Sequence, residues 1–294
     1  MKNQTIAVGL LFVFSTLFFA HAQETYLVPV DRPELVGTTS HQLIELEHSM
    51  KMSVTAGGNA LQDQAQGWSA SIDVMRTVDK VDEKGEPTEL TLKFKKFAVT
   101  RNGDTNEELP ADTVLKASRT ANDTSYKIDG EEVESEVSEI LAAGFGLTQG
   151  EGDENKAFGV DQARKIGEEW DIDGKEMLST IPDEMPFEFK NDACTGKAKL
   201  EEVTGNGESK IAKLSGIFQL AIEKMEGFPA AAEIKNATMK VTHAGDFPLN
   251  TKLQPVKEII SMSMGLKADI PIPGGDKAEM NLSMEMKRSA KIIP

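Results

Sequence analysis

The feature that most constrains the fold of this 294-residue chain is a strict alternation of apolar and polar residues that recurs in long runs. Along Ile44–Val54, every even position carries an apolar side chain or a histidine, and charged or hydroxyl side chains lie between them. Met262–Ile270 and Met280–Met286 repeat the pattern. Because successive side chains of a β-strand point to opposite faces, each run predicts a strand with one buried face.

Shorter or less regular runs extend this pattern over most of the chain. They lie at Ala70–Val78, Leu90–Phe94, Tyr126–Ile128, Phe187–Phe189, Cys194–Val203, Ile211–Ile222, Met239–Thr242 and Lys252–Ile260. Turn-forming residues separate them, and Gly57–Gly67 is interpreted as a polar gap. Strands joined by short turns pair as antiparallel neighbours. We therefore expect a mainly β (α+β) fold, in which two related antiparallel β-meander halves form a curved sheet or half-barrel with one to three short helices across its concave side.

Two segments have helical spacing instead. Apolar residues at intervals of three and four, which favour an amphipathic helix, occur at Val133, Val137, Ile140 and Leu141. Asp129 and Glu132 precede this run with the spacing of a capping box. A second short helix is predicted after Asp173, where Glu176 again gives that spacing and Pro182 ends the apolar run.

A short strand centred on Trp170 is predicted between the two regions of sheet. Ile166, Trp170 and Ile172 occupy even positions, so they share one face of an extended chain, and Trp170 is expected to be a buried anchor. The segment around Gly167 and Trp170 resembles a strand with a glycine, two residues and a tryptophan in secreted bacterial proteins grouped only as domains of unknown function. That resemblance implies the start of a second β-rich half and brings no assigned activity.

The first 22 residues have the composition of an export signal. Lys2 supplies a positive start, Ile6–Ala20 is mostly apolar, and Ala20-His21-Ala22 matches a small-residue cleavage site. We expect cleavage after Ala22 and a mature protein in the periplasm or outside the cell. No later run is long enough for a membrane-spanning helix, and the residue directly after the cleavage site is Gln23 and not cysteine, so neither a membrane span nor a lipid anchor is expected.

The mature chain divides at an acidic, glycine-rich stretch, Gln149–Asn155. We expect an N-terminal β-rich half at 23–152 and a C-terminal β-rich half at 153–294, which together could form one continuous domain. An offset of 122 residues carries Val81 onto Val203 and Ile44 onto Ile166 in matching strand phase. Either a duplication or chance agreement between glycine-containing turns would give this offset.

The charge balance limits the partners of the chain. Lys and Arg number 32 against 48 Asp and Glu, a formal net charge of −16 that becomes −17 when Lys2 leaves with the signal. Nucleic acids and anionic membrane surfaces are bound by clustered cations, so both are disfavoured. Cys194 is the single cysteine and excludes an intramolecular disulfide, which favours a bacterial exported protein over a disulfide-rich animal one.

No set of residues indicates an enzyme. The mature chain has three histidines, His41, His48 and His243, and Cys194 lies in no nucleophile motif. Acidic pairs are so frequent that none of them marks a general acid or base. The sequence therefore predicts a protein that is not an enzyme and that has no cofactor, with Cys194 as a buried thiol.

The methionines stand out from the background because pairs at spacing of two point their thioethers to the same side of a strand. Core packing is the interpretation that the sequence favours. A ligand-binding face is the second, with candidate residues Met262, Met264, Met280, Met284 and Met286. A copper(I) or other soft-metal site is the third, for which His48, Met50 and Met52 share one face of a single strand.

These observations favour an extracytoplasmic, non-enzymatic binding protein with an apolar concave face for a hydrophobic ligand or a protein partner, neither of which the sequence identifies. The expected layout is similar to that of periplasmic carriers of lipids and lipoproteins, a likeness of architecture that does not fix function. A periplasmic protein that handles copper(I) or another soft metal is the alternative.

Overall fold

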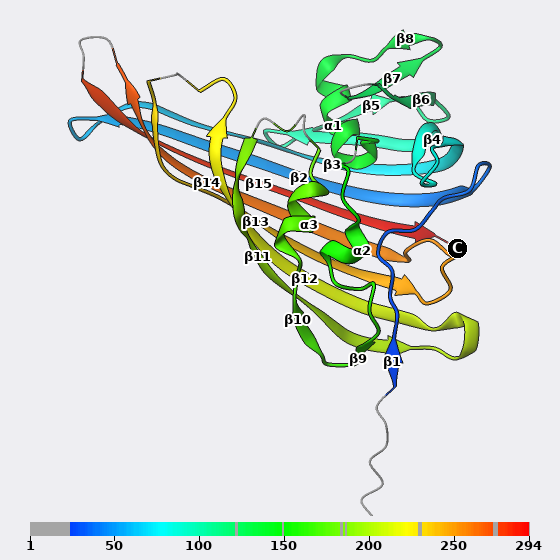
Figure 1. Cartoon of the computed structure of the whole chain (residues 1–294). Helices are drawn as coiled ribbons and strands as arrows, with labels where there is room; N and C mark the ends of the chain where they lie inside the picture. Colours follow the sequence, from blue (N-terminus) through cyan, green and yellow to red (C-terminus); the bar gives the residue numbers. More distant parts are fainter. Residues whose placement is uncertain are drawn as a thin grey trace, which may run out of the picture.

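The protein is built around one large antiparallel sheet. The computed structural model describes residues 24–120, 123–148, 150–182, 185, 187–228, 231–272 and 276–293, so the predicted signal and cleavage site lie outside the described part. Within it, 13 strands form a single sheet that is open at both ends of its strand order, and three α-helices lie beside it (Figure 1). The mainly β fold with a few short helices is confirmed.

The N-terminal part of the chain supplies one end of the sheet. Its strands are β2 (Thr39–Ala56), β3 (Asn59–Val81), β4 (Pro87–Arg101), β5 (Asp104–Leu109), β6 (Val114–Arg119), β7 (Thr124–Ile128) and β8 (Glu131–Glu132). Consecutive strands pair as antiparallel neighbours, except that β4 pairs with both β5 and β6. The segment interpreted as a polar gap is strand for most of its length, because β3 begins at Asn59 and pairs with β2 from there.

The C-terminal part of the chain forms the other end of the sheet. Its strands are β10 (Glu169–Asp171), β11 (Phe187–Thr204), β12 (Ile211–Met225), β13 (Glu233–Pro248), β14 (Lys257–Pro271) and β15 (Lys277–Ile293). They follow one another across the sheet in chain order, and a 3₁₀ turn at Gly207–Ser209 joins β11 to β12. A separate two-stranded ribbon pairs β1 (Thr25–Tyr26) with β9 (Arg164–Lys165).

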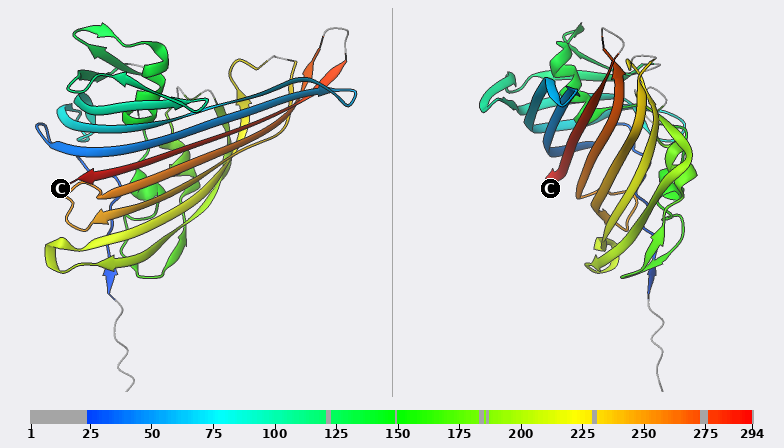
Figure 2. Two further views of the ribbon diagram at one scale, coloured as in Figure 1. Left: turned by 180° about the vertical axis from the view of Figure 1, so that it is seen from behind. Right: turned by 90° about the vertical axis from the view of Figure 1, so that its left-hand side faces the viewer.

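The two ends of the sheet meet where the last strand of the chain pairs with the first long one. In β15 and β2, fifteen residue pairs run from Glu279 opposite Thr55 to Ile293 opposite His41. The sheet is therefore continuous across the predicted boundary between the two halves. Both views of Figure 2 show β15 lying between β14 and β2 in the middle of the curved sheet.

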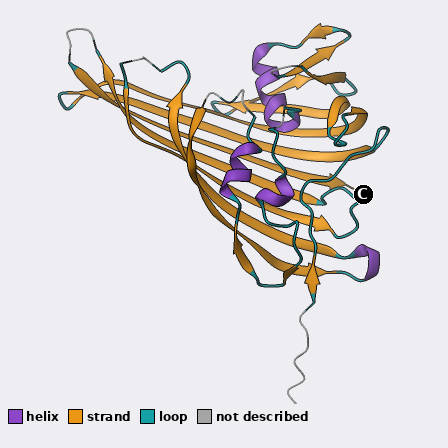
Figure 3. Cartoon of the chain, in the orientation of Figure 1, coloured by secondary structure: helices purple, strands orange, loops and turns teal. Residues whose placement is uncertain are grey.

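All three helices lie on one face of the sheet (Figure 3). They are α1 (Ser135–Phe145), α2 (Glu154–Ala157) and α3 (Gly174–Ser179). We call this side the helix face, and the opposite side the open face. The even positions of β2, such as Ile44 and Leu46, are buried on the helix face, while Glu45 and Glu47 between them are exposed.

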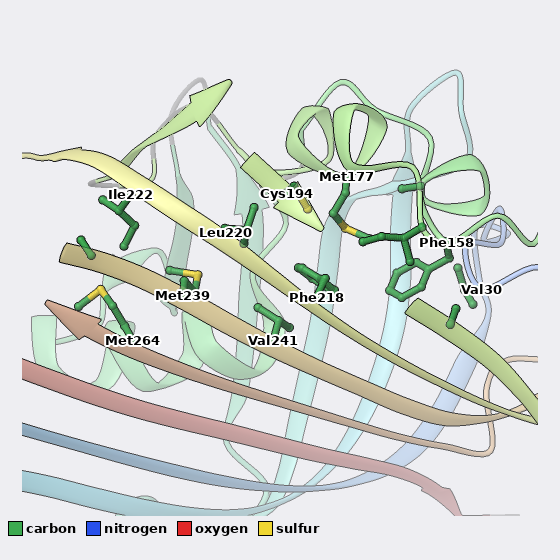
Figure 4. Packing of buried hydrophobic residues seen from close by; sticks show 14 of the residues in the cluster. Val30, Phe158, Met177, Cys194, Phe218, Leu220, Ile222, Met239, Val241 and Met264 are labelled. Carbon is green, nitrogen blue, oxygen red and sulfur yellow. The ribbon is translucent and has the colours of Figure 1, made fainter. Parts of the chain in front are cut away.

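Two hydrophobic clusters fill the helix face. Under α1, the buried helix residues Val137, Ile140 and Leu141 pack with strands of the N-terminal part. Under α2 and α3, a second cluster combines strands of the C-terminal part, and Figure 4 shows Phe158 and Met177 close to Phe218 of the sheet. Burying large apolar side chains is the dominant stabilising contribution in such clusters.

Both predicted helices are confirmed, although the first begins later than predicted. Val137, Ile140 and Leu141 are buried as expected, but α1 begins at Ser135, and the predicted capping pair lies before it in a turn and in β8. A left-handed backbone at Asp129 starts that turn, so the chain reverses before it can become helical. The second capping prediction is correct, because the Asp173 carboxylate accepts hydrogen bonds from the amides of Lys175 and Glu176.

Trp170 is the buried anchor that the sequence predicts. Its side chain is 8% exposed, and its indole NH donates to the carbonyl of Phe158 at 2.7 Å. The Arg164 guanidinium lies 4.5 Å from the ring centroid and donates to the carbonyl of Gly159. Ile166 does not share this face, however: it lies in a turn and is 38% exposed, because the strand here is limited to three residues.

A lead-in segment before β2 ties the two parts together. Arg32 is 7% exposed, and its guanidinium donates to the carbonyls of Pro248 at 2.6 Å and Leu253 at 2.7 Å in the C-terminal part. Two residues later, Glu34 makes a two-pronged ion pair with Arg76 of β3, with nitrogen-to-oxygen distances of 2.6 and 2.7 Å. Such paired, partly buried contacts fix geometry, since breaking one partner leaves the other desolvated.

Replacing Trp170 should test its role as an anchor. Trp170→Ala removes a buried ring and leaves the carbonyl of Phe158 without its donor, so we expect a loss of about 3–5 kcal/mol in the free energy of unfolding. Denaturant titration followed by circular dichroism measures it. Ile166→Ala, at the exposed position in the same motif, is the control and should cost less than about 1 kcal/mol; equal losses would contradict the assignment.

Candidate functional site

The structure gathers the candidate methionines into one surface on the helix face. Met50 of β2 lies opposite Met284 of β15, which lies opposite Met264 of β14, which in turn lies opposite Met239 of β13. Methionine thus occupies the same row on four neighbouring strands. The two sets of residues that the sequence assigned to separate interpretations therefore belong to one surface.

The next row of the helix face combines methionine with aromatic rings. Met262 lies opposite Met286, Met286 opposite His48, and His48 opposite Trp68 of β3. The His48 and Trp68 rings stack with centroids 5.5 Å apart and an angle of 24° between their planes. We call Met50, Met262, Met284, Met286, His48 and Trp68 the thioether patch.

Burial divides the methionines into two groups. Met264 and Met280 are 4% and 7% exposed and belong to the hydrophobic cluster under α2 and α3, as core packing requires. Met50, Met52, Met262, Met284 and Met286 are only partly buried. The partly buried group lies along the middle strands β14, β15 and β2, where the clusters under the helices meet. Met50, Met52, Met262 and Met284 nevertheless pack against the cluster, so core packing accounts for all of the set except Met286. The partial exposure of these side chains is what distinguishes them from Met264 and Met280.

His48 differs from the other described histidines in its surroundings. His41 accepts or donates a hydrogen bond with Asp73 at 2.7 Å, and His243 with Glu258 at 3.0 Å. Among the described residues, His48 has a ring contact with Trp68 and no hydrogen-bond partner within reach of its nitrogens. Burial lowers the pKa of His48, although the nearby carboxylate of Glu139 in α1 acts in the opposite direction. Its imidazole is therefore held mainly neutral at neutral pH.

The open face carries a long groove on the same strands. One hollow of about 770 Å³ is lined from β13 through β14, β15, β2 and β3 to the end of β4, and another of about 580 Å³ lies farther along the same strands. Thr238 of the second hollow and Lys240 of the first are consecutive same-face positions of β13, so the hollows lie end to end. We call the two together the polar groove.

Short polar side chains and opposite charges line the polar groove. Across neighbouring strands, Lys240 lies opposite Ser263, Ser263 opposite Glu285, and Glu285 opposite Ser49. Hydroxyl groups come from Ser49, Ser53, Ser69, Thr100, Thr238, Thr242, Ser261, Ser263 and Ser283. Charges come from Lys51, Lys240, Lys267, Lys287, Glu47, Asp63 and Glu285, so cations and anions are nearly balanced there.

The hollows lie on the face to which the sequence assigned no role. Helices across one side of the sheet and an apolar lining there are predicted, and the helix face has both features. The hollow of about 770 Å³ lies on the opposite face, and most of its lining residues have polar side chains. The physical reason is that the helices satisfy the apolar face of the sheet, which leaves the polar positions of the alternating strands to line the open side.

A smaller hollow of about 220 Å³ on the helix face is lined by residues that form ion pairs. It lies between the end of α1 and the ends of β14 and β15, and Glu34, Arg76, Glu258 and Arg288 line it. Glu258 accepts from Arg288 at 2.7 Å and shares a hydrogen bond with His243. Burial alone would raise the pKa of Glu258, but these two partners outweigh it and lower the pKa to about 2. Its charged groups pair with one another, which indicates a structural role.

Two further observations concern residues that can bind metals or act as nucleophiles. Cys194 is buried, and burial raises the pKa of its thiol to about 11, so it is held as a neutral thiol. The predicted buried cysteine is confirmed. In residues 24–293 apart from the gaps given above, no three or more His, Cys, Asp or Glu side chains are arranged to hold a metal ion.

Comparisons with known proteins assign no family. No family profile matches the chain, and no curated protein matches it. A structure from a study of lipid–protein interactions in lipovitellin is similar with a TM-score of 0.36 and 8% identity, over 88% of this chain and 25% of the other. The chain thus spans about a quarter of that protein.

Two bacterial proteins show weaker likeness. Pseudomonas aeruginosa OpdQ has a TM-score of 0.21 and 9% identity, over 87% of this chain and 98% of the other. An outer membrane channel from Pseudomonas putida F1 has a TM-score of 0.20 and 12% identity, over 90% and 99%. These similarities are too low to support a function. The described helices include none with the length and apolar character needed to cross a bilayer.

The polar groove is the surface that sequence reasoning missed. Its signal was present in the residues between the apolar positions, where serine, threonine and glycine recur in the central strands. From the sequence, only the apolar face of these strands was assigned a role. What a single sequence does not give is that β13, β14, β15, β2 and β3 become neighbours, because the β15–β2 pairing joins residues more than 200 positions apart.

The ion-pair cluster predicts a pH dependence of stability. Because the pKa of Glu258 is lower in the folded state than its ordinary value of 4.5, its ionised form contributes stability above about pH 4.5. That contribution is lost as the pH falls towards 2. Glu258→Gln should therefore cost about 2–3 kcal/mol at pH 7, where Arg288 and His243 lose their partner, and progressively less between pH 4.5 and pH 2.

Denaturant unfolding of wild type and variant at pH 7, 4.5 and 2.5 measures this difference. Glu188→Gln is the control, because Glu188 pairs with Lys224 at the surface, where an ion pair contributes about 0–1 kcal/mol. If the difference in free energy of unfolding between wild type and Glu258→Gln stays constant with pH, these ion pairs do not determine the loss of stability in acid.

Proposed function

We propose that this chain is an exported, non-enzymatic binding protein whose polar groove receives an extended segment of a protein partner. The observation that carries the proposal is the groove itself: two hollows of about 770 and 580 Å³ that lie end to end along the central strands of one continuous sheet. A recess that long, on strands rather than on loops, suits an elongated occupant.

The chemistry of the lining favours a polypeptide over other occupants. A lipid tail needs continuous apolar walls, whereas most residues that line the two hollows carry hydroxyl, amide or charged groups among the apolar carbon atoms of the lining. A glycan is commonly bound by stacking on aromatic rings, and Trp68, the aromatic residue among the described lining residues, belongs to the thioether patch of the helix face. A polypeptide offers both charges and many amide groups, which match serine, threonine and paired charges.

The charge of the groove also differs from that of the whole chain. The full chain carries a net charge of −16, but the groove contributes four lysines and three acidic residues. Lys287 and Glu47 already pair across β15 and β2 at 3.2 Å. A partner of mixed charge therefore meets complementary groups there, and electrostatic complementarity of this kind gives specificity and faster association.

Gly265 lines the polar groove, and it is a suitable position for a crosslinking residue. A Cβ atom built on it meets no atom within 4 Å, so a larger side chain fits without distorting the sheet. With a photo-crosslinking residue at Gly265 in cells that export the protein, we expect a discrete crosslinked product, identified by mass spectrometry. The same residue at Glu107, which is exposed on β5, is the control and should give no such product.

Blocking the groove should remove the product. Gly265→Trp fills the floor beside Ser263, so a crosslinker placed at Ser263 should lose its product in this variant while the melting temperature stays within a few degrees. Products that are identical at Gly265 and Glu107, or that persist when the groove is blocked, would contradict a groove-bound partner. Absence of any product in the producing organism would contradict the proposal as a whole.

Export is the second part of the proposal, and it rests on the composition of residues 1–22. We expect the exported protein to begin at Gln23, because the Ala20-His21-Ala22 tripeptide ends a charged and then apolar segment. N-terminal sequencing of protein from the extracytoplasmic fraction measures it. Ala22→Asp should block cleavage and retain the precursor. Protein that keeps Met1 and remains in the cytoplasm would contradict export.

A further inference from the structure

The thioether patch combines soft ligands from two strands that are far apart in sequence. His48 and Met50 are same-face neighbours on β2, and Met286 and Met284 lie directly opposite them on β15. Opposite residues have Cβ atoms about 4.5–5.5 Å apart, and same-face neighbours on one strand are separated by about 7 Å. One imidazole and three thioethers thus occupy the corners of a small rectangle whose side chains all point to the same side.

We propose that His48, Met50, Met284 and Met286 form a binding site for one copper(I) ion. Thioether sulfur and neutral imidazole nitrogen are ligands that copper(I) accepts, and hard cations such as magnesium and calcium do not favour them. The four side chains lie on the helix face, so the site goes beyond the proposed binding of a protein segment and does not depend on it, although His48 and Met286 are also among the residues that border the first hollow of the groove.

The state of His48 fits the role of a ligand. Within the described residues its ring nitrogens contact no hydrogen-bond partner, whereas His41 and His243 each share a hydrogen bond with a carboxylate. The stacked Trp68 ring holds the imidazole plane in place. A ring that is fixed and otherwise unengaged loses little freedom on binding, and preorganisation of this kind raises affinity.

The state of the methionines fits as well. All three candidate ligands are partly buried, so a small ion can reach their sulfur atoms, whereas Met264 and Met280 in the adjoining core are buried. Gln66 lies opposite Met50 and points an amide nitrogen at its sulfur, 3.9 Å away, which orients the side chain. The carboxylate of Glu139 in α1 adds a negative field near His48 that favours a bound cation.

The patch differs from the single-strand site that the sequence suggests. Met52 shares the face of His48 and Met50, but it lies opposite Leu282 rather than a methionine. The third and fourth ligands come from β15 instead. Met52→Leu is therefore a stringent variant: it should leave copper affinity within about twofold of wild type, because a volume-conserving swap disturbs the core little.

The test uses the mature full-length chain under reducing, oxygen-free conditions. Copper(I) is titrated in competition with the chromogenic chelator bicinchoninate, and one equivalent should be retained by the protein. Met50→Leu, Met284→Leu, Met286→Leu and His48→Gln should each weaken affinity at least tenfold. Silver(I), a soft ion that does not change its oxidation state, should quench Trp68 emission in wild type and less in the His48 and Met286 variants.

A matched pair of controls comes from the other face of the sheet, on β2 and its neighbour β3. His41 and Met75 lie opposite each other on β2 and β3, so His41→Gln and Met75→Leu remove the same residue types without touching the patch. Metal-free melting curves of all variants confirm folding. Retention of no copper by wild type, or equal weakening by the controls, would overturn the proposal. X-ray absorption with sulfur and nitrogen neighbours around copper supports it, and a sphere of oxygen alone contradicts it.

Discussion

The pairing of β15 with β2 is the interaction on which the rest of the structure depends. Fifteen residue pairs join the last strand of the chain to the first long one, so the two parts become one sheet instead of two sheets with exposed edges. An unpaired edge of that length is prone to intermolecular pairing. We call this pair of strands the seam. Closing so long a stretch of chain costs conformational entropy. Buried apolar side chains on both strands of the seam, such as Met280 and Val54, offset that cost.

The seam gives the protein two central surfaces with opposite chemistry. Because strand side chains alternate, most apolar positions in the central parts of β14, β15 and β2 lie on the helix face, and many of the polar positions between them line the groove. The helices cover the apolar face over both ends of the sheet. They leave the middle partly exposed, and there the chain carries methionine, histidine and tryptophan rather than the leucine and isoleucine of the covered regions.

The alternation of apolar and polar residues predicted where most strands lie, but it did not predict which distant strands pair. The alternation around Ile44, Met264 and Met284 identified the strands, their buried faces and the antiparallel class, because burial of one face leaves a direct mark on the sequence. The segment from Asn59 to Gly67 was missed as strand: its residues are exposed on both faces, so no apolar period marks it. Ile166 was misplaced because alternation continues through a turn that the left-handed Gly167 forms.

The site was predictable only in its parts. The sequence placed Met50 and Met284 on the correct faces of their strands, but the register that sets them opposite each other is a property of the assembled sheet. The partial exposure of His48 likewise depends on how far α1 extends over the sheet. Residues that share a strand can be grouped from sequence, whereas residues that share a site across a seam need the register.

The position of the copper(I) site at the seam has a thermodynamic consequence. Its ligands come in pairs from β2 and β15, so an ion bound by all four holds the two strands in register and binds the folded state in preference to the unfolded one. Ligand at 100 times its dissociation constant stabilises a folded protein by about 2.7 kcal/mol. Metal occupancy would therefore strengthen the same pairing that shapes the polar groove on the opposite face. The thioether patch and the polar groove share the strands β14, β15, β2 and β3. A change in the register of these strands therefore alters both surfaces.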